Sequence, residues 1–194
     1  MDIQPVTLAG RYTRLEPLSL DHVPCFCRIG LDESVWTWMP VRMRSERDIR
    51  KMVEDALAEG GRGVSLPFAT VSLEAGEVAG GTRYLNIDRA NRHVEIGYTW
   101  LAPAWQRTAV NTEAKFLMLR HAFETLSCLR VEWKTDSLNV RSRQAILRLG
   151  ATEEGIFRNH MLMPGGRVRH SAYYSMTFQE WPAAKANLLR RLSN

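Results

Sequence analysis

The sequence predicts a mixed α/β fold with its elements in the order βααβββαβαββα. Residues 94–101 alternate between apolar and polar side chains, which is typical of a half-buried strand. Residues 111–126 place apolar side chains at helical spacing over a wide arc, which predicts a helix that is covered on most of its circumference. Pro103 separates the two stretches, because proline has no N–H to donate to a strand ladder. The 194 residues are expected to form a single domain, residues 1–194.

The first half of the chain is expected to supply one strand and two helices before the antiparallel run. The first strand is expected over residues 7–17, followed by a helix that Asp21 can cap and that ends near Gly30. Ser45 and Asp48 resemble a capping box for the second helix, which ends at a pair of glycines. Two strands then follow, over residues 67–73 and 78–87, joined by a glycine-containing hairpin turn.

The central strand is expected to place Val94, Ile96, Tyr98 and Trp100 on one face and Glu95 on the other. After the long helix comes a strand over residues 130–134. Asn139 is expected to cap a helix over residues 140–149, before a strand pair over 151–163 and 167–178 and a closing helix. The antiparallel run followed by one strand–helix–strand crossover therefore predicts a mixed sheet.

Bulk composition indicates a soluble globular protein, with 45% hydrophobic and 24% charged residues. No apolar run approaches the roughly 20 residues that a membrane span needs, and the start has no secretory pattern. Cys25, Cys27 and Cys128 match neither a disulfide framework nor a zinc motif, so we expect free thiols, a cytoplasmic location and no metal.

The start of the long helix is a candidate anion site. Residues 106–112 form a run of backbone N–H groups at this start, where unpaired donors and the helix dipole favour a negative charge. The net charge supports this interpretation, since residues 1–97 carry −2 and residues 98–194 carry +7.

The same segment resembles a known family. Gln106-Arg107-Thr108-Ala109-Val110-Asn111 occupies the place of the Gln/Arg-x-x-Gly-x-Gly/Ala loop of the GNAT superfamily of acyl-CoA N-acyltransferases, although Ala109 and Asn111 replace both glycines. The order and spacing of further residues, from about His93 to Trp181, are similar to the RimJ/RimL branch, which acetylates ribosomal-protein N-termini. These residues are Glu95-Ile96-Gly97-Tyr98, Asn111-x-Glu113-Ala114-Lys115, Arg130-Val131-Glu132, Asp136, Asn139, Ser142 and Gly150-Ala151.

The resemblance implies a GNAT-type sheet whose two central parallel strands splay apart around acetyl-CoA. It also implies direct transfer of the acetyl group to a primary amine in a ternary complex. Backbone N–H groups near Trp100 and Leu101 would hold the thioester, and the loop from Gln106 to Thr112 (Gln106, Arg107, Thr108, Ala109, Val110, Asn111 and Thr112) would cradle the pyrophosphate. The amide of Asn139 would pair with the pantetheine arm.

Acyl transfer needs a neutral amine and a proton for the departing thiolate. Glu95 is the candidate general base, acting through water; the alternative is a carboxylate satisfied by a neighbouring strand or an arginine. The position where many GNAT enzymes carry a tyrosine acid is Ile146 here. Ser142 is therefore the candidate for hydrogen bonding to the sulfur, unless its hydroxyl only bonds its own helix.

Further candidates are residues that would bind the phosphates of the cofactor or the acceptor. Arg107 and Arg143 are the expected phosphate partners, whereas Arg141 and Arg148 are expected on a solvated surface. Trp36, Trp38 and His160 are candidates for acceptor binding: the tryptophans would line its entrance, and the histidine would relay a proton. Packing is the alternative for the tryptophans.

The acceptor stays open between a protein N-terminus and a small-molecule amine, and the acidic first half favours a cationic one. A catalytically silent acyl-CoA sensor or scaffold is the alternative function. Nucleic-acid binding is disfavoured, since the basic half lacks interleaved aromatic residues. Monomer and homodimer are both compatible with the sequence.

Overall fold

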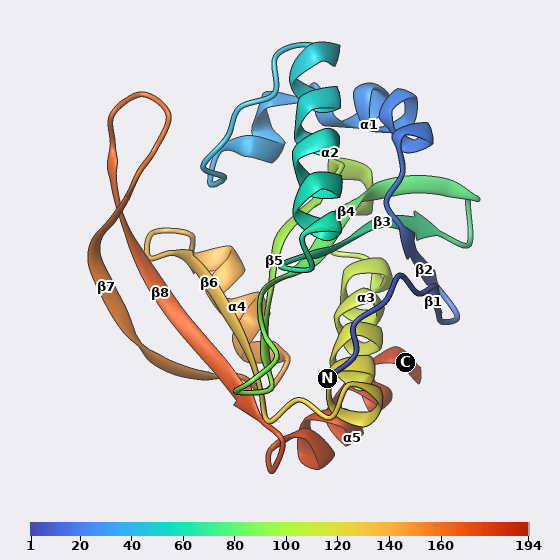
Figure 1. Ribbon diagram of the computed structural model, residues 1–194, viewed down its shortest axis with the longest axis vertical. Coiled ribbons are helices and arrows are strands. Elements are labelled where there is room, and N and C mark those ends of the chain that lie inside the picture. Colours follow the sequence, from blue (N-terminus) through green and yellow to red (C-terminus); the bar gives the residue numbers. More distant parts are fainter. Residues whose placement is uncertain (194) are drawn as a thin grey trace.

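The computed structural model describes residues 1–193 and is organised around one eight-stranded mixed sheet in the order β1-β2-β3-β4-β5-β6-β8-β7 (Figure 1). The strands are β1 Leu8–Ala9, β2 Thr13–Pro17, β3 Leu66–Ser72, β4 Glu77–Asp88, β5 His93–Leu101, β6 Arg130–Asp136, β7 Thr152–Leu162 and β8 Val168–Thr177. The helices are α1 Val23–Gly30, α2 Glu46–Gly61, α3 Ala109–Arg120, α4 Val140–Arg148 and α5 Trp181–Ser193, with short helical turns η1 Leu20–His22, η2 Glu33–Trp36, η3 Pro103–Trp105 and η4 His121–Thr125. The predicted mixed α/β class and the single crossover are confirmed.

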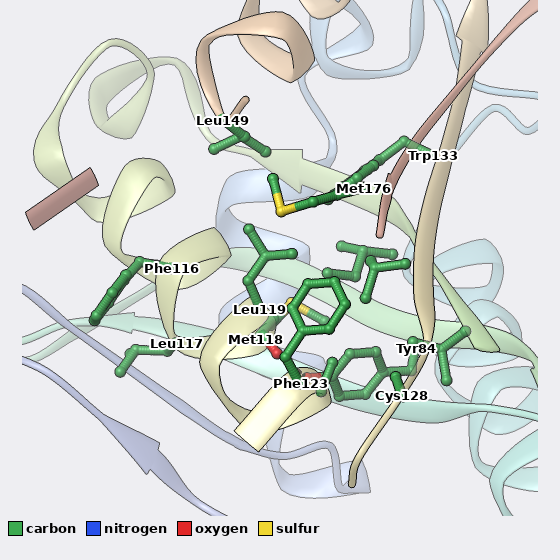
Figure 2. Packing of buried hydrophobic residues seen from close by; sticks show 14 of the residues in the cluster. Tyr84, Phe116, Leu117, Met118, Leu119, Phe123, Cys128, Trp133, Leu149 and Met176 are labelled. Atoms are coloured by element: carbon green, nitrogen blue, oxygen red, sulfur yellow. Dashed lines mark hydrogen bonds between the residues drawn. The ribbon is translucent and has the colours of Figure 1, made fainter. Parts of the chain in front are cut away.

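Two helical layers cover opposite faces of the sheet. The larger core cluster lies between the sheet and α3, α4 and α5, and α3 contributes to it over most of its circumference, as predicted. Figure 2 shows Leu119 of α3 directed toward Met176 of β8. The sulfur of Met118 lies 3.7 Å from Thr82 Oγ1 on β4. Burial of each such side chain contributes about 1.5–3 kcal/mol. The second cluster lies between α1, α2 and the other face.

The pairing of the central strands β5 and β6 defines the middle of the sheet. These strands are parallel, but they pair only at His93↔Arg130, Val94↔Val131 and Glu95↔Glu132. Both strands continue beyond the last pair, to Leu101 and Asp136. They therefore diverge, and the edge of β5 that faces β6 is left without a strand partner.

A bulge in β5 changes which face its side chains occupy. Tyr98 has φ +47°, in the left-handed region, and the pairing of β4 with β5 is irregular at the same place. Val94 and Ile96 face α3, whereas Trp100 packs in the cluster under α1 and α2. The prediction that Val94, Ile96, Tyr98 and Trp100 share one face is therefore wrong beyond Ile96, because the extra residue reverses the alternation.

The segment predicted as one strand over residues 7–17 forms two strands, β1 and β2, joined by a tight turn. Glu113, on α3, holds this turn: its carboxylate accepts hydrogen bonds from the backbone N–H groups of Arg11, Tyr12 and Thr13 at 2.8, 2.6 and 2.7 Å. The turn thus exists because a buried carboxylate about a hundred residues away binds three adjacent donors.

Local signals at the helix ends are mostly confirmed. Ser45 caps α2 with Asp48, and Asn139 caps α4. The first helical segment is capped by Ser19 instead of Asp21, because the chain enters a turn of 3₁₀ helix, η1, before α1. Over residues 1–193, no helix is both long and apolar enough to cross a bilayer.

The contact between Glu113 and the β1–β2 turn predicts the effect of a methyl group at Gly10. A Cβ at this position would lie 2.3–2.6 Å from the carboxyl atoms of Glu113. We expect Gly10→Ala to lower the free energy of unfolding by about 1–3 kcal/mol, as overpacking does. The measurement is urea unfolding followed by circular dichroism.

The matched control is Gly61→Ala at the end of α2, where a Cβ would have no heavy atom within 4 Å. This variant should be neutral or slightly stabilising. Equal unfolding midpoints for the two variants would show that the turn does not depend on the carboxylate.

Candidate active site

The loop between β5 and α3 gathers hydrogen-bond donors at the place where β5 and β6 diverge. Thr108 caps α3: its Oγ1 accepts from the N–H of Val110 at 3.3 Å and donates to the carbonyl of Trp105 at 2.9 Å. Arg107 is exposed and has φ +64°, in the left-handed region. The first-turn N–H groups have no intrahelical partner and can receive an anion.

Gln106 ties this loop across the opening. Its Nε2 donates to the carbonyl of Leu101 at 2.9 Å, at the end of β5, and its Oε1 accepts from Arg141 Nη2 at 2.6 Å. Arg141 lies in the first turn of α4, which follows β6. The Gln106–Arg141 pair therefore connects the chain after β5 to the chain after β6.

Arg143 lies elsewhere. Its Nε donates to the hydroxyl of Tyr174 at 2.8 Å, and its Nη2 pairs with the carboxylate of Glu153 at 3.0–3.1 Å. The side chain thus turns toward β7 and β8. Arg141, expected on a solvated surface, is indeed exposed, but it is the arginine that contacts Gln106 within residues 106–112.

Asn139 and Ser142 meet at the start of α4. The Asn139 Oδ1 accepts from the backbone N–H of Ser142 at 3.0 Å, which is the predicted cap. The Ser142 hydroxyl is half-buried and makes no hydrogen bond with the described residues. Ala109, Asn111 and Thr112 lie on the first turn of α3. Ile146, on α4, is buried against the core.

Glu95 is buried on the face of the sheet opposite α3. Its Oε2 accepts from Asn86 Nδ2 at 2.7 Å and from Lys134 Nζ at 2.9 Å. Its Oε1 accepts from no described residue and lies 3.1 Å from where a Cβ of Gly97 would stand. One carboxylate oxygen is thus held in an ion pair, and the other accepts no hydrogen bond from residues 1–193.

Further polar side chains extend this face from β6 across β8 to β7. The hydroxyl of Tyr173 lies 3.3 Å from His160 Nε2, and His160 Nδ1 lies 3.0 Å from Ser171 Oγ. Burial lowers the pKa of His160, and the positive charges of Lys134 and Arg169 lower this pKa further. Burial also raises the pKa of Tyr173. The neutral imidazole and the phenol can therefore pass a proton between β8 and β7.

Lys134, Tyr173 and Ser171 are not among the site residues expected from the sequence. The available signal is the two-residue period of β6 and β8. Asp136 pairs with Ser171 and Lys134 with Tyr173, so alternate residues of both strands share this face.

The two tryptophans of the early loop differ in burial. Trp36 is 3% exposed, donates its indole N–H to the carbonyl of Gly30 at 2.6 Å and packs on Trp100. The expectation that it lines the acceptor entrance is therefore wrong, because η2 turns this indole into the core. Trp38 is 37% exposed, and the guanidinium of Arg167 lies 5.8 Å from its ring centroid.

Lys115 is a buried cation on the other face of β5. Its Nζ donates to Thr82 Oγ1 at 2.8 Å and to Thr99 Oγ1 at 2.6 Å, directly beside the bulge. No carboxylate within residues 1–193 lies within 4.0 Å of it. Burial lowers the pKa of Lys115 to about 7. No sequence signal separates this lysine from an exposed one.

Comparisons with known proteins agree with this geometry. A family model described as "Acetyltransferase (GNAT) domain" matches residues 13–152. The Bacillus subtilis (strain 168) protein named "Putative ribosomal N-acetyltransferase YdaF" is 33% identical over 114 residues, which cover 58% of this chain and 61% of that protein. The match thus spans less than two thirds of the relative's length.

Solved structures resemble the whole chain. A "putative acetyltransferase" from T. thermophilus is 36% identical with a TM-score of 0.89, covering 99% of this chain and 100% of that one. A GCN5-related N-acetyltransferase from Brucella melitensis is 32% identical with a TM-score of 0.89, covering 98% of this chain and 86% of that one.

The buried amine of Lys115 predicts a pH-dependent stability. Its pKa is about 7 in the folded chain and about 10.4 when unfolded. Above pH 7 the unfolded state therefore binds more protons, and stability rises with pH. Relative to Lys115→Met, the free energy of unfolding of the natural protein should rise by on the order of 1 kcal/mol per pH unit between about pH 7 and 10.

Urea unfolding of both proteins at a series of pH values measures this difference. A difference that stays constant with pH would mean that the folded amine is not neutralised by burial.

Proposed function

This chain belongs to the GNAT acetyltransferase family, and we propose that it transfers an acetyl group from acetyl-CoA to a primary amine. The observation that carries the proposal is the divergence of β5 and β6 after three residue pairs, directly in front of the donor-rich start of α3. Residues 1–194 would act as a single domain. The three free cysteines favour a cytoplasmic, reducing setting.

The residues beside the divergence fit the chemistry of coenzyme A. Its pyrophosphate needs several N–H donors and positive charge, which the first turn of α3, Arg107 and Arg141 supply. Its pantetheine arm carries amides, which the unpaired edge of β5 near Trp100 and Leu101 and the side chain of Asn139 can bind. Bound acetyl-CoA supplies the thioester carbonyl carbon that the amine attacks.

The residues of the opposite face would prepare the amine. Glu95 takes a proton from the acceptor ammonium through water, using its free Oε1, while Lys134 keeps the carboxylate oriented through Oε2. His160, Tyr173 and Ser171 provide an adjoining proton path. The free hydroxyl of Ser142 is in our proposal the donor that hydrogen-bonds the sulfur.

The acceptor would be a protein N-terminus or a small-molecule amine. The name of the Bacillus subtilis relative contains "ribosomal N-acetyltransferase", which supports a ribosomal-protein N-terminus. The alternative is a silent acyl-CoA sensor. It is favoured by the two missing loop glycines, since Ala109 and Asn111 occupy their places, and by the lack of a tyrosine acid at Ile146. Saturable CoA binding without thiol release on a broad amine panel would support the sensor.

The proposed cofactor site predicts the effect of neutralising its arginines. Arg107→Gln and Arg141→Gln should each weaken the Kd for CoA about tenfold, because hydrogen bonds to charged groups contribute about 1.5–3 kcal/mol. The exposed Arg148→Gln on the same helix as Arg141 is the control and should leave Kd unchanged. Isothermal calorimetry measures all three, and an absence of heat with the natural protein at millimolar CoA would refute the proposed site.

The proposed base predicts a change in turnover without a change in cofactor affinity. Glu95→Gln should lower kcat/KM for the amine by about 10²–10⁴-fold, with Kd for CoA preserved. Thiol release measures the first quantity and calorimetry the second. A variant with undiminished thiol release would show that Glu95 only supports the sheet.

A further inference from the structure

Arg169, on β8, is a buried guanidinium without a carboxylate partner. It is 5% exposed, and its Nε donates to Ser171 Oγ at 3.0 Å. Its two terminal nitrogens donate to no residue within 1–193, and no carboxylate in that range lies within 4.0 Å of it. A buried charge of this kind is costly unless it is paired. The terminal nitrogens are not among the fully buried polar atoms that lack a partner, so they reach solvent and are available to the carboxylate of a bound molecule.

The neighbouring carboxylates are already engaged. Asp136 pairs with Arg167 and accepts the backbone N–H of Leu138, and Glu95 pairs with Lys134. Burial lowers the pKa of Arg169 while Asp136 raises it, but an arginine stays protonated in a protein. Of Lys134, Arg167 and Arg169, only Arg169 has no carboxylate of residues 1–193 within 4.0 Å.

The register places Arg169 beside the proposed point of transfer. Ser171 pairs with Asp136, and Tyr173 pairs with Lys134, which contacts Glu95. Side chains of one face repeat about every 6.6 Å along a strand, so the Arg169 Cα lies roughly 7 Å beyond Ser171 and 13 Å beyond Tyr173. The Arg169 side chain extends toward Ser171, so its guanidinium lies closer to Glu95 than its Cα does.

We propose that Arg169 is the carboxylate-binding residue of the acceptor site, so that the preferred acceptor carries a carboxylate a few bonds from its reacting amine. This inference rests on the proposed acetyl transfer. The span matches an extended peptide, which rises about 3.3 Å per residue, with Asp or Glu at its second or third position. A planar guanidinium binds such a carboxylate through two parallel hydrogen bonds.

Two neighbours orient the guanidinium. Ser171 is fully buried and accepts from Nε, and His160 contacts the same hydroxyl, so the Nε side of the guanidinium is held at Ser171. Arg167 lies over Trp38, and Arg42 donates to the carbonyl of Pro164 at 3.4 Å. These contacts join the loop after η2 to the β7–β8 hairpin and mark the end of the acceptor face beyond Arg169.

An anionic acceptor runs against the cationic one expected from the acidic first half of the chain. The net charge of a segment sums all its side chains, whichever face they occupy. At Arg169 the local pairing decides instead: Asp136 is paired with Arg167 and Glu95 with Lys134, so no ion pair offsets the charge of Arg169.

The test compares acceptor peptides that share an N-terminal residue and carry either Glu or Gln at position two or three. Free glutamate is assayed as a separate acceptor. The natural protein should show kcat/KM about 10–100-fold higher for the Glu peptide, as expected for a charge-assisted pair. In Arg169→Gln this ratio should fall to near one, while the control Arg148→Gln should keep it. A preference for free glutamate over both peptides would instead assign the carboxylate to a small molecule.

Calorimetric titration of the same peptides into the CoA complex gives a readout that does not depend on turnover. It should show the same preference for the Glu peptide over the Gln peptide. Arg169→Gln should lose this preference, and Arg169→Lys, which keeps the charge, should reduce it. The lysine variant replaces the glutamine variant if the latter does not fold. Turnover with no Glu preference, or a preference that survives both substitutions, would overturn the assignment of Arg169 and leave acetyl transfer intact. CoA binding with no thiol release from any acceptor would count against the proposed function instead.

Discussion

The hydrogen bonds that β5 and β6 do not form are the constraint on which the rest of the structure depends. Parallel strands normally stay paired, and unpaired backbone groups need other partners. Here the pairing ends at Glu95↔Glu132, and side chains frame the opening at both ends. The Glu95–Lys134 ion pair links the strands where they separate, and Gln106 with Arg141 links the segments that follow them. Two side-chain contacts thus bridge the opening, one at each end.

The bulge at Tyr98 determines which face of the sheet the following side chains of β5 occupy. Without it, Tyr98 and Trp100 would continue the α3 face of Ile96; with it, they face α1 and α2, and Arg83 packs over the Tyr98 ring at 3.9 Å. The bulge also brings Thr99 under α3, where the buried amine of Lys115 binds it. One left-handed residue therefore decides that Thr99 faces α3 while Tyr98 and Trp100 face α1 and α2.

The local charge on the face of the sheet that holds Glu95 and Asp136 depends on which side chains form ion pairs there. Glu95 and Asp136 each have a cation within ion-pair distance, and only after these pairs are counted does the unmatched charge of Arg169 become visible. The same reasoning separates Arg141 from Arg143, which differ by two positions on α4. Arg141 contacts Gln106 in the loop before α3, and Arg143 is engaged by Glu153 and Tyr174. A half turn of helix is enough to change the partner, because residues two apart do not share a helix face.

Local hydrogen bonds are what the sequence by itself determined. The cap at Asn139, the capping pair of Ser45 and Asp48, and the glycine hairpin before β4 involve residues within a few positions of one another, so a short stretch of sequence specifies them. Only the tertiary structure decided the two-strand start held by Glu113, the burial of Trp36, the Tyr98 bulge and the ion pairs of the acceptor face. Each of these joins groups from distant parts of the chain. Their energies depend on distances and burial that exist only once the sheet has assembled.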